Sequence, residues 1–140
     1  MDAILSVLVP LKPMQLALRC CAGFLTVAMS LGLYFGGAQP VAVELFPWPW
    51  GKLVHSIVFG VLACSAGYAT GLRGWRGVVA GFCVSVSVGA MDEWHQLFLP
   101  GRHGQLSDLF FDAIGAALGA GMLSTRERLE KRIGSFLTHR

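Results

Sequence analysis

Apolar residues are concentrated in four stretches of the chain, and polar residues lie mostly between them. A helix needs roughly 20 apolar residues to cross the ~30 Å hydrocarbon core of a bilayer. The first two stretches have that length, and the last two reach it only if the polar residues at one end continue the same helix. The pattern predicts transmembrane helices at about residues 16–35, 53–72, 77–98 and 108–123.

The composition agrees with a membrane protein. Of the 140 residues, 54% are hydrophobic and 14% are charged, whereas soluble domains contain about 25% charged residues. The first apolar stretch is longer than the ~7–15-residue core of a signal peptide, so we expect it to be retained as a helix. The fold class expected is therefore all-α: a single domain over residues 1–140, built as an integral membrane bundle of four transmembrane helices.

Lysines and arginines sort to one side of this bundle. If both termini lie on the same side, that side carries nine of the eleven: Lys12, Arg19, Arg73, Arg76, Arg126, Arg128, Lys131, Arg132 and Arg140. Cytoplasmic segments of membrane proteins are enriched in Lys and Arg. We therefore expect both termini in the cytoplasm, with residues 124–140 as a charged helical tail. The net charge of +3 then reflects orientation against anionic lipid, and no nucleic-acid partner is expected.

The opposite, outer ends of the helices carry polar side chains that a membrane span would normally exclude. Lys52 and His55 are three residues apart, and Asp108 and Asp112 are four apart, so each pair shares a helix face. The end of the third helix and the loop after it add Asp92, Glu93, His95, Gln96, Arg102 and His103. Ionisable residues at membrane depth are costly unless paired or hydrated, which makes this set a candidate functional site.

Small residues continue the stripe that Asp108 and Asp112 begin. Gly115 and Gly119 follow at helical spacing, and such a pair allows a neighbouring helix to approach closely. We expect the two carboxylates to face into the bundle. Ordinary structural explanations remain open for several of these side chains, because a lysine can extend to lipid headgroups and an aspartate can end a helix.

Three motifs in this region resemble those of the VanZ-like membrane protein family. Residues 52–55 (KLVH) resemble the family's DKxxH element, and residues 92–102 (DEWHQLFLPGR) resemble its DExxQxFxPGR element. Asp108, Asp112 and Gly115 resemble its D-xxx-N-xx-G element, and the whole resemblance spans about residues 44–121. Two positions depart from the family pattern: Gly51 stands where Asp is usual, and Asp112 where Asn is usual.

The resemblance implies a multi-pass protein of the bacterial cytoplasmic (inner) membrane with a role in the cell envelope. The family is associated with low-level resistance to the glycopeptide antibiotic teicoplanin. The resemblance thus implies a location and a site more than a reaction, and whether the protein is an enzyme stays open. The oligomeric state stays open as well.

Two hypotheses follow for the site. In the first, the site binds or modifies an envelope lipid or glycolipid headgroup, with Glu93, His55 and Asp112 as candidate acid–base residues. Ligand binding would then fall to Lys52, Asp92, Gln96, Arg102 and Asp108. In the second, the protein is a non-enzymatic accessory membrane protein and the cluster is a structural ion-pair network. The spacing matches no metal motif such as HExxH, so neither a metal nor another cofactor is expected.

Overall fold

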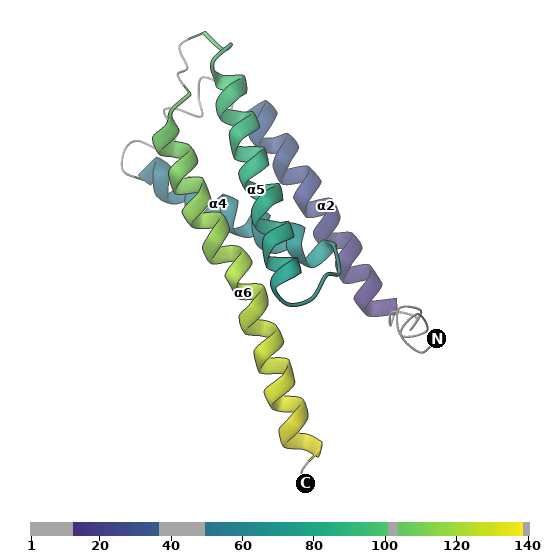
Figure 1. Cartoon of the computed structure of the whole chain (residues 1–140). Helices are drawn as coiled ribbons and strands as arrows, with labels where there is room; N and C mark the ends of the chain where they lie inside the picture. Colours follow the sequence, from purple (N-terminus) through teal and green to yellow (C-terminus); the bar gives the residue numbers. More distant parts are fainter. Residues whose placement is uncertain (1–12, 37–49, 101–103, 139–140) are drawn as a thin grey trace.

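The computed structural model describes residues 13–36, 50–100 and 104–138. These residues form four α-helices and no strand (Figure 1). The helices are α2 (Pro13–Gly36), α4 (Trp50–Ala69), α5 (Trp75–Gln96) and α6 (Leu106–Thr138). The expected all-α fold is confirmed.

Three of these helices are long and apolar enough to cross a membrane: α2, α4 and the Leu106–Arg126 part of α6. Helix α5 has 22 residues, which at 1.5 Å per residue would also span the hydrocarbon core. Its buried residues are all small or polar, and acidic residues occupy its last turns, so its hydropathy is lower. Three of the four predicted spans are therefore supported by length and composition, and α5 stays a prediction.

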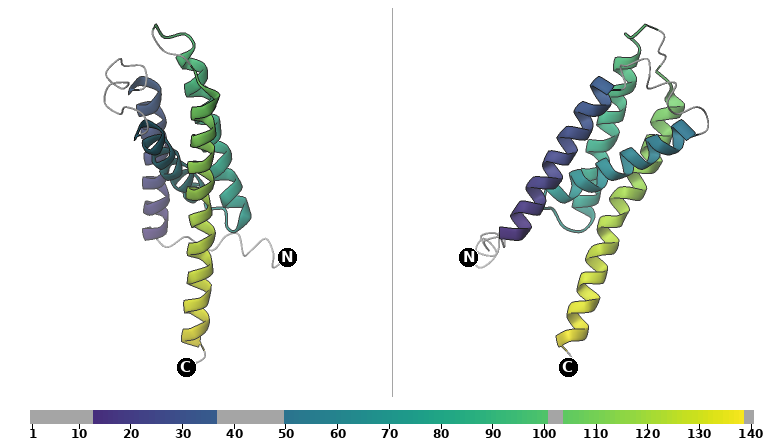
Figure 2. Two further views of the ribbon diagram at one scale, coloured as in Figure 1. Left: turned by 90° about the vertical axis from the view of Figure 1, so that its left-hand side faces the viewer. Right: turned by 180° about the vertical axis from the view of Figure 1, so that it is seen from behind.

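Helix α4 is the centre of the bundle, because it packs against α2, α5 and α6. It runs obliquely across the other helices (Figure 2). The buried apolar residues on α4 and α6 are Phe59, Leu62, Ala63, Ala66, Ala116 and Ala120. Most of them are alanine, which keeps the helix backbones close. In contrast, no residue of α2 is buried, so this helix lies at the edge of the bundle.

The predicted close approach at Gly115 and Gly119 is confirmed. A Cβ at Gly115 would collide with the backbone of Ser56, and a Cβ at Gly119 with the backbone of Gly60. On α5, a Cβ at Gly81 would likewise collide with the carbonyl oxygen of Ala63. Packing through small residues is the usual way in which helices associate in a bilayer, where water no longer drives apolar surfaces together.

Interhelical hydrogen bonds accompany the small residues. The Ser85 hydroxyl donates to the Phe59 carbonyl oxygen at 2.8 Å and joins α5 to α4. The Ser56 hydroxyl donates to the Phe111 carbonyl oxygen at 3.0 Å and joins α4 to α6. Thr26 and Ser65 share a hydrogen bond of 3.0 Å between α2 and α4. These bonds fix the rotation of each helix, and with it the direction in which the site residues point.

Helix α6 has 33 residues and continues beyond its apolar part as one unbroken helix (Figure 1). The charged segment expected as a separate tail is therefore the extension of the fourth helix. Residues 122–133 contain neither Gly nor Pro, so nothing in this stretch interrupts the backbone hydrogen bonds.

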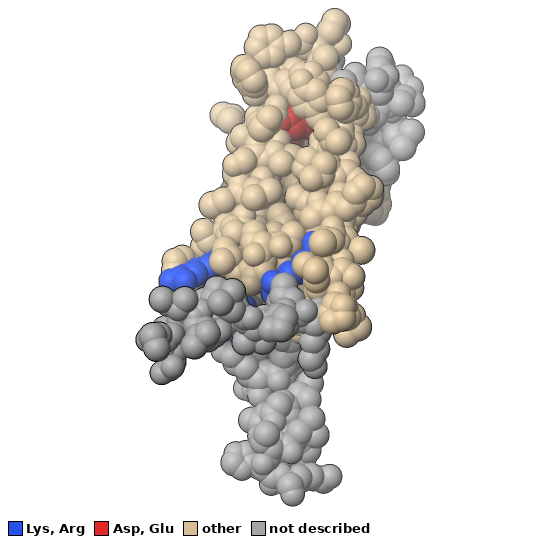
Figure 3. Space-filling model, turned by 90° about the vertical axis from the view of Figure 1, so that its right-hand side faces the viewer, with Lys and Arg blue, Asp and Glu red and all other residues tan. Residues whose placement is uncertain are grey.

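The described charged residues separate to the two ends of the bundle. The acidic end is formed by the starts of α4 and α6 with the end of α5, and it holds Lys52, Asp92, Glu93, Asp108 and Asp112. The basic end is formed by the start of α2, the α4–α5 turn, the start of α5 and the middle of α6, and it holds Arg19, Arg73, Arg76, Arg126 and Arg128. Figure 3 shows basic side chains low on one face and an acidic side chain recessed near the other end.

Candidate functional site

His55 and Asp112 form the deepest contact of the acidic end. Nδ1 of His55 lies 3.2 Å from Oδ1 of Asp112 and joins α4 to α6. The Asp112 side chain is 1% exposed, whereas that of His55 is 34% exposed. A buried carboxylate beside Nδ1 favours the tautomer in which Nδ1 carries the proton, which leaves Nε2 as the acceptor nitrogen. The pair thus fixes the orientation of the ring and leaves Nε2 as its basic nitrogen.

Lys52 is held by the first turn of α6. Its Nζ lies 3.4 Å from Oδ1 of Asp108 and donates a hydrogen bond of 3.1 Å to Oγ of Ser107. The ammonium group also lies 5.1 Å from the centre of the Phe111 ring. These contacts direct Lys52 toward α6. Asp108 gains a second favourable interaction, because a carboxylate in the first turn faces the positive end of the helix dipole.

Glu93 ties the end of α5 to the start of α6. Its Oε2 accepts a hydrogen bond of 2.6 Å from the backbone N–H of Gln105, the residue that precedes α6. A hydrogen bond from a backbone N–H to a charged carboxylate is stronger than a hydrogen bond between two neutral groups. The other oxygen, Oε1, is buried and has no hydrogen-bond partner among the described residues. Glu93 therefore has a structural contact through one oxygen, while the other remains available for further chemistry.

Asp92 and Gln96 form a second polar pair at the end of α5. The Gln96 amide nitrogen donates to Oδ2 of Asp92 at 2.9 Å, and both side chains are buried. Residues four apart lie on one helix face, so the pair follows from the sequence spacing. The amide fixes the direction of the carboxylate.

These contacts belong to one cluster that lies between three helices. A Cβ added at Gly89 of α5 would come within 3.2 Å of Oδ2 of Asp112 and of the Phe59 ring. Asp112 therefore reaches across to α5, one helical turn from Glu93. The carboxylates of Asp92 and Asp108 also interact electrostatically with Asp112. Gly89 makes room for this junction, because any side chain at that position would press on the carboxylate.

The structure brings together seven of the eight residues predicted for the site: Lys52, His55, Asp92, Glu93, Gln96, Asp108 and Asp112. Arg102 lies outside the described residues, as does His103. Nothing in the structure tests whether any of the eight binds a ligand or takes part in catalysis, so these roles stay predictions. No group of three or more residues suited to hold a metal ion occurs in the described part of the chain.

Three features of the site were not predicted from the sequence. Gln105 contributes a backbone N–H, which has no sequence signal. Gly89 could be recognised as part of the site only from its position four residues before Glu93. The ring of Tyr34 on α2 stacks on His95, with ring centres 4.0 Å apart and planes 13° from parallel. Helix α2 therefore borders the site.

An apolar pocket adjoins the cluster between α2 and α5. It has a volume of about 160 Å³ and is lined by Ser30, Leu31, Leu33, Tyr34, Val88, Met91 and Asp92. All but Ser30, Tyr34 and Asp92 are apolar. The pocket is thus mainly apolar, and Asp92 of the acidic end is among the residues that line it.

Comparisons with known proteins agree with the resemblance seen in the motifs. No curated protein and no solved structure matches the chain significantly. The model of the VanZ/LLP1 family matches residues 7–127, a range that covers α2, α4 and α5 and the apolar part of α6. Because the match covers well over half of the chain, the protein belongs to the VanZ/LLP1 family.

Proposed function

We propose that this protein is a multi-pass protein of the bacterial cytoplasmic membrane whose acidic end binds or modifies the headgroup of an envelope lipid or glycan. The acidic end would face outward and the basic end the cytoplasm, as the distribution of lysine and arginine favours. The observation that carries the proposal is the junction of α4, α5 and α6, where four carboxylates, Lys52 and His55 meet. Such a cluster among apolar helices is costly to maintain.

The balance of charge favours a ligand rich in hydroxyl groups. Among the described residues, four carboxylates face one lysine and one histidine, so the site offers more acceptors than donors. Sugar hydroxyls donate well to carboxylates, whereas a phosphate would meet repulsion. The apolar pocket beside Asp92 suits a hydrocarbon chain carried by the same ligand. A glycolipid or another hydroxyl-bearing lipid fits both features.

A modification reaction, if the site performs one, would begin at His55. With Nδ1 held by Asp112, Nε2 can accept a proton from a ligand hydroxyl and thereby raise its nucleophilicity. Glu93 is the alternative base, through the oxygen that has no hydrogen-bond partner among the described residues.

A structural role is the second candidate, and a specific observation favours it. The contacts of Lys52 and His55 each join α4 to α6, and that of Glu93 joins α5 to the residue that precedes α6. Ion pairs of this kind can fix the register of a bundle without any ligand. The protein would then be an accessory subunit of the envelope machinery.

Variants of the full chain separate the two candidates. His55→Ala and Glu93→Gln are expressed alongside Ser87→Ala, a control on the exposed side of α5. Three quantities are measured together: protein level in the membrane, teicoplanin susceptibility of the host, and co-purified lipids by mass spectrometry. We expect the two site variants to retain normal levels while losing both the phenotype and a specific co-purified lipid. Loss of phenotype only in proportion to loss of protein would favour the structural role.

A further inference from the structure

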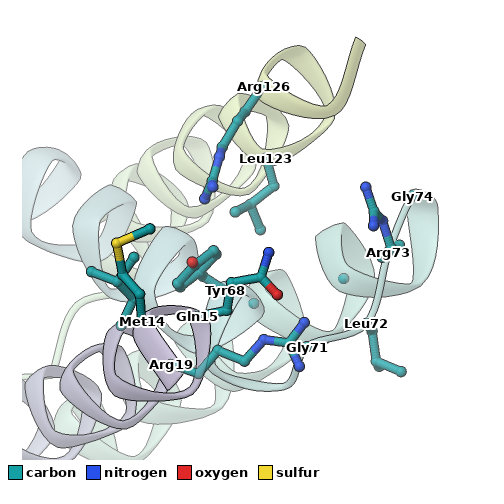
Figure 4. A pocket seen from close by; sticks show the side chains of 13 residues that line it. Met14, Gln15, Arg19, Tyr68, Gly71, Leu72, Arg73, Gly74, Leu123 and Arg126 are labelled. Atoms are coloured by element: carbon teal, nitrogen blue, oxygen red, sulfur yellow. The ribbon is translucent and has the colours of Figure 1, made fainter. Parts of the chain in front are cut away.

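Helix α2 borders two pockets, one at each end of the bundle. The pocket at the basic end is polar, because arginine, glutamine and tyrosine side chains contribute to its lining (Figure 4). The pocket at the acidic end lies between α2 and α5 and is mainly apolar. Of the two, this second pocket adjoins the candidate site, since Asp92 lines it. Its geometry indicates how a lipid ligand would reach the site.

The α2–α5 pocket follows both helices for about one turn. Its lining extends from Ser30 to Tyr34 on α2 and from Val88 to Asp92 on α5, and four residues of a helix correspond to about 6 Å. Its volume is about 160 Å³, whereas pockets that hold whole ligands measure about 300–1,000 Å³. The pocket therefore has room for a short stretch of one chain and not for a complete lipid.

The pocket lies at the surface of the bundle rather than in its core. Leu31 on α2 and Met91 on α5 line it, and they are 52% and 59% exposed. Because α2 is long and apolar enough to cross a membrane, residues exposed along it face hydrocarbon chains. The Ser30 hydroxyl already donates to the Thr26 carbonyl oxygen at 2.8 Å, so this part of the pocket offers little to water. The occupant that fits is a hydrocarbon chain from the surrounding bilayer.

Contacts on either side of the pocket hold α2 in place. Toward the basic end, Thr26 and Ser65 share a hydrogen bond that ties α2 to α4. Toward the acidic end, the ring of Tyr34 stacks on His95 and ties α2 to α5, with ring centres 4.0 Å apart. His95 lies one turn beyond Asp92 on α5. The stack thus closes the pocket at the end where its lining becomes polar.

We propose that a membrane lipid reaches the acidic end sideways, with part of one hydrocarbon chain between α2 and α5 and its headgroup beside Asp92. Tyr34 and His95 act as positioning residues, because their stacked rings hold α2 where it shapes the pocket. The bilayer is as apolar as the pocket, so the pocket orients the lipid while the polar groups hold its headgroup. This inference rests on the proposed function, and it makes the ligand a lipid of the adjoining leaflet rather than a soluble glycan.

The test uses two photoreactive lipids that differ only in the headgroup, glucosyldiacylglycerol and phosphatidylcholine. Each carries a diazirine near the headgroup end of one acyl chain, the part of the chain that the pocket would hold. The full chain is irradiated in nanodiscs that contain one probe, and labelled residues are identified by peptide mass spectrometry. Labelling of the pocket is compared with labelling of exposed apolar residues outside it, such as Val61 and Leu118. Native mass spectrometry of the same discs gives the oligomeric state.

Two matched pairs of variants fill the pocket from its two walls. Val88→Trp on α5 is compared with Val84→Trp, one turn away and outside the lining. Leu31→Trp on α2 is compared with Leu25→Trp, which also lies outside the lining. The α2 pair serves if Val88→Trp does not fold, because Leu31 is half exposed and tolerates a larger side chain. Tyr34→Phe keeps a ring to stack on the histidine, and Tyr34→Leu does not.

We expect the glucosyl lipid to label the pocket more strongly than the other exposed apolar residues. This excess should be lost in Val88→Trp, Leu31→Trp and Tyr34→Leu, and kept in both controls and in Tyr34→Phe. Absence of the excess in the wild type, or its persistence in the filled variants, would overturn the inference. A dimer that Val88→Trp abolishes would make a second copy the occupant and overturn it as well.

The two probes separate this inference from the proposed function. An equal excess from both lipids would support the chain site and count against the proposed choice of headgroup. A lipid that co-purifies in a manner dependent on His55, without excess labelling of the pocket, would support the proposed function and overturn the sideways route.

Discussion

Replacing Gly119 by alanine tests whether the contact between α4 and α6 positions the site. The new Cβ would lie 2.5 Å from the carbonyl carbon and 2.6 Å from Cα of Gly60. Carbon atoms in contact prefer about 3.5–4.0 Å, so the two helices must separate by roughly 1 Å. The obstacle is backbone rather than a flexible side chain, so it has no local way to move aside. Overpacking of this kind costs about 1–3 kcal/mol.

The same displacement acts on the site. The hydrogen bond between His55 and Asp112 joins the same two helices and measures 3.2 Å. A separation of roughly 1 Å would stretch it beyond hydrogen-bonding distance. Gly119→Ala is therefore expected to weaken both stability and the envelope phenotype, although it lies about two turns from Asp112.

Unfolding by SDS in mixed micelles measures the change in the free energy of unfolding. Gly121→Ala is the matched control, because a Cβ at Gly121 meets no atom within 4 Å. Gly121→Ala is expected to change the free energy of unfolding by less than about 0.5 kcal/mol. Because α6 stays helical in the unfolded state of a membrane protein, the substitution affects the backbone of both states alike. Equal stability of the two variants would refute the close backbone contact and the reasoning built on it.

Three further predictions concern single contacts and the orientation. Ser85→Ala removes a buried hydrogen bond to Phe59 and should cost about 0.5–1 kcal/mol in the same unfolding assay, with Ser87→Ala near zero. Lys52→Ala breaks a pair with Asp108 that is about a quarter exposed on both sides. It should therefore cost no more than about 1 kcal/mol; a larger loss would show that the pair is shielded from water. A reporter fused after residue 102 should read as outside and one fused after residue 132 as cytoplasmic, and the reverse result would invert the proposed topology.

Periodicity in the sequence predicted the parts of the site that lie along one helix. The spacing of Asp108, Asp112, Gly115 and Gly119 predicted a polar stripe followed by a close helix contact, and the contact is present. The hydrogen bond from Gln96 to Asp92 was not predicted, although a helical spacing of four would have allowed it. The prediction of the stripe succeeds because the geometry of an α-helix is fixed by its backbone.

Pairing between helices could not be predicted in the same way. The sequence does not specify that His55 meets Asp112 while Lys52 meets Asp108, because the crossing angle and register of α4 on α6 decide it. The bond from Gln105 to Glu93 uses a backbone N–H, which every residue except proline carries. The charged end of the chain was expected as a separate tail, and it continues α6 because neither glycine nor proline breaks the helix there.

The two departures from the family pattern involve the same histidine. An aspartate at position 51 would lie four residues before His55 and therefore on the same face of α4, whereas Asp112 contacts His55 from α6. Gly51 removes one carboxylate and Asp112 supplies another, so the number of carboxylates near His55 is unchanged.

This exchange predicts a rescue. Asp112→Asn alone should be the mildest of the site variants, because the amide oxygen can still accept from Nδ1 of His55 but no longer stabilises a positive charge on the ring. Adding Gly51→Asp should restore the wild-type phenotype, since an acidic residue in the first turn of α4 is also favoured by the helix dipole. Gly51→Asp alone, with two carboxylates beside His55, is the control. A deficit in Asp112→Asn that Gly51→Asp does not reduce would show that the carboxylate is required on α6 itself. An Asp112→Asn variant identical to the wild type would show that His55 needs no carboxylate at all.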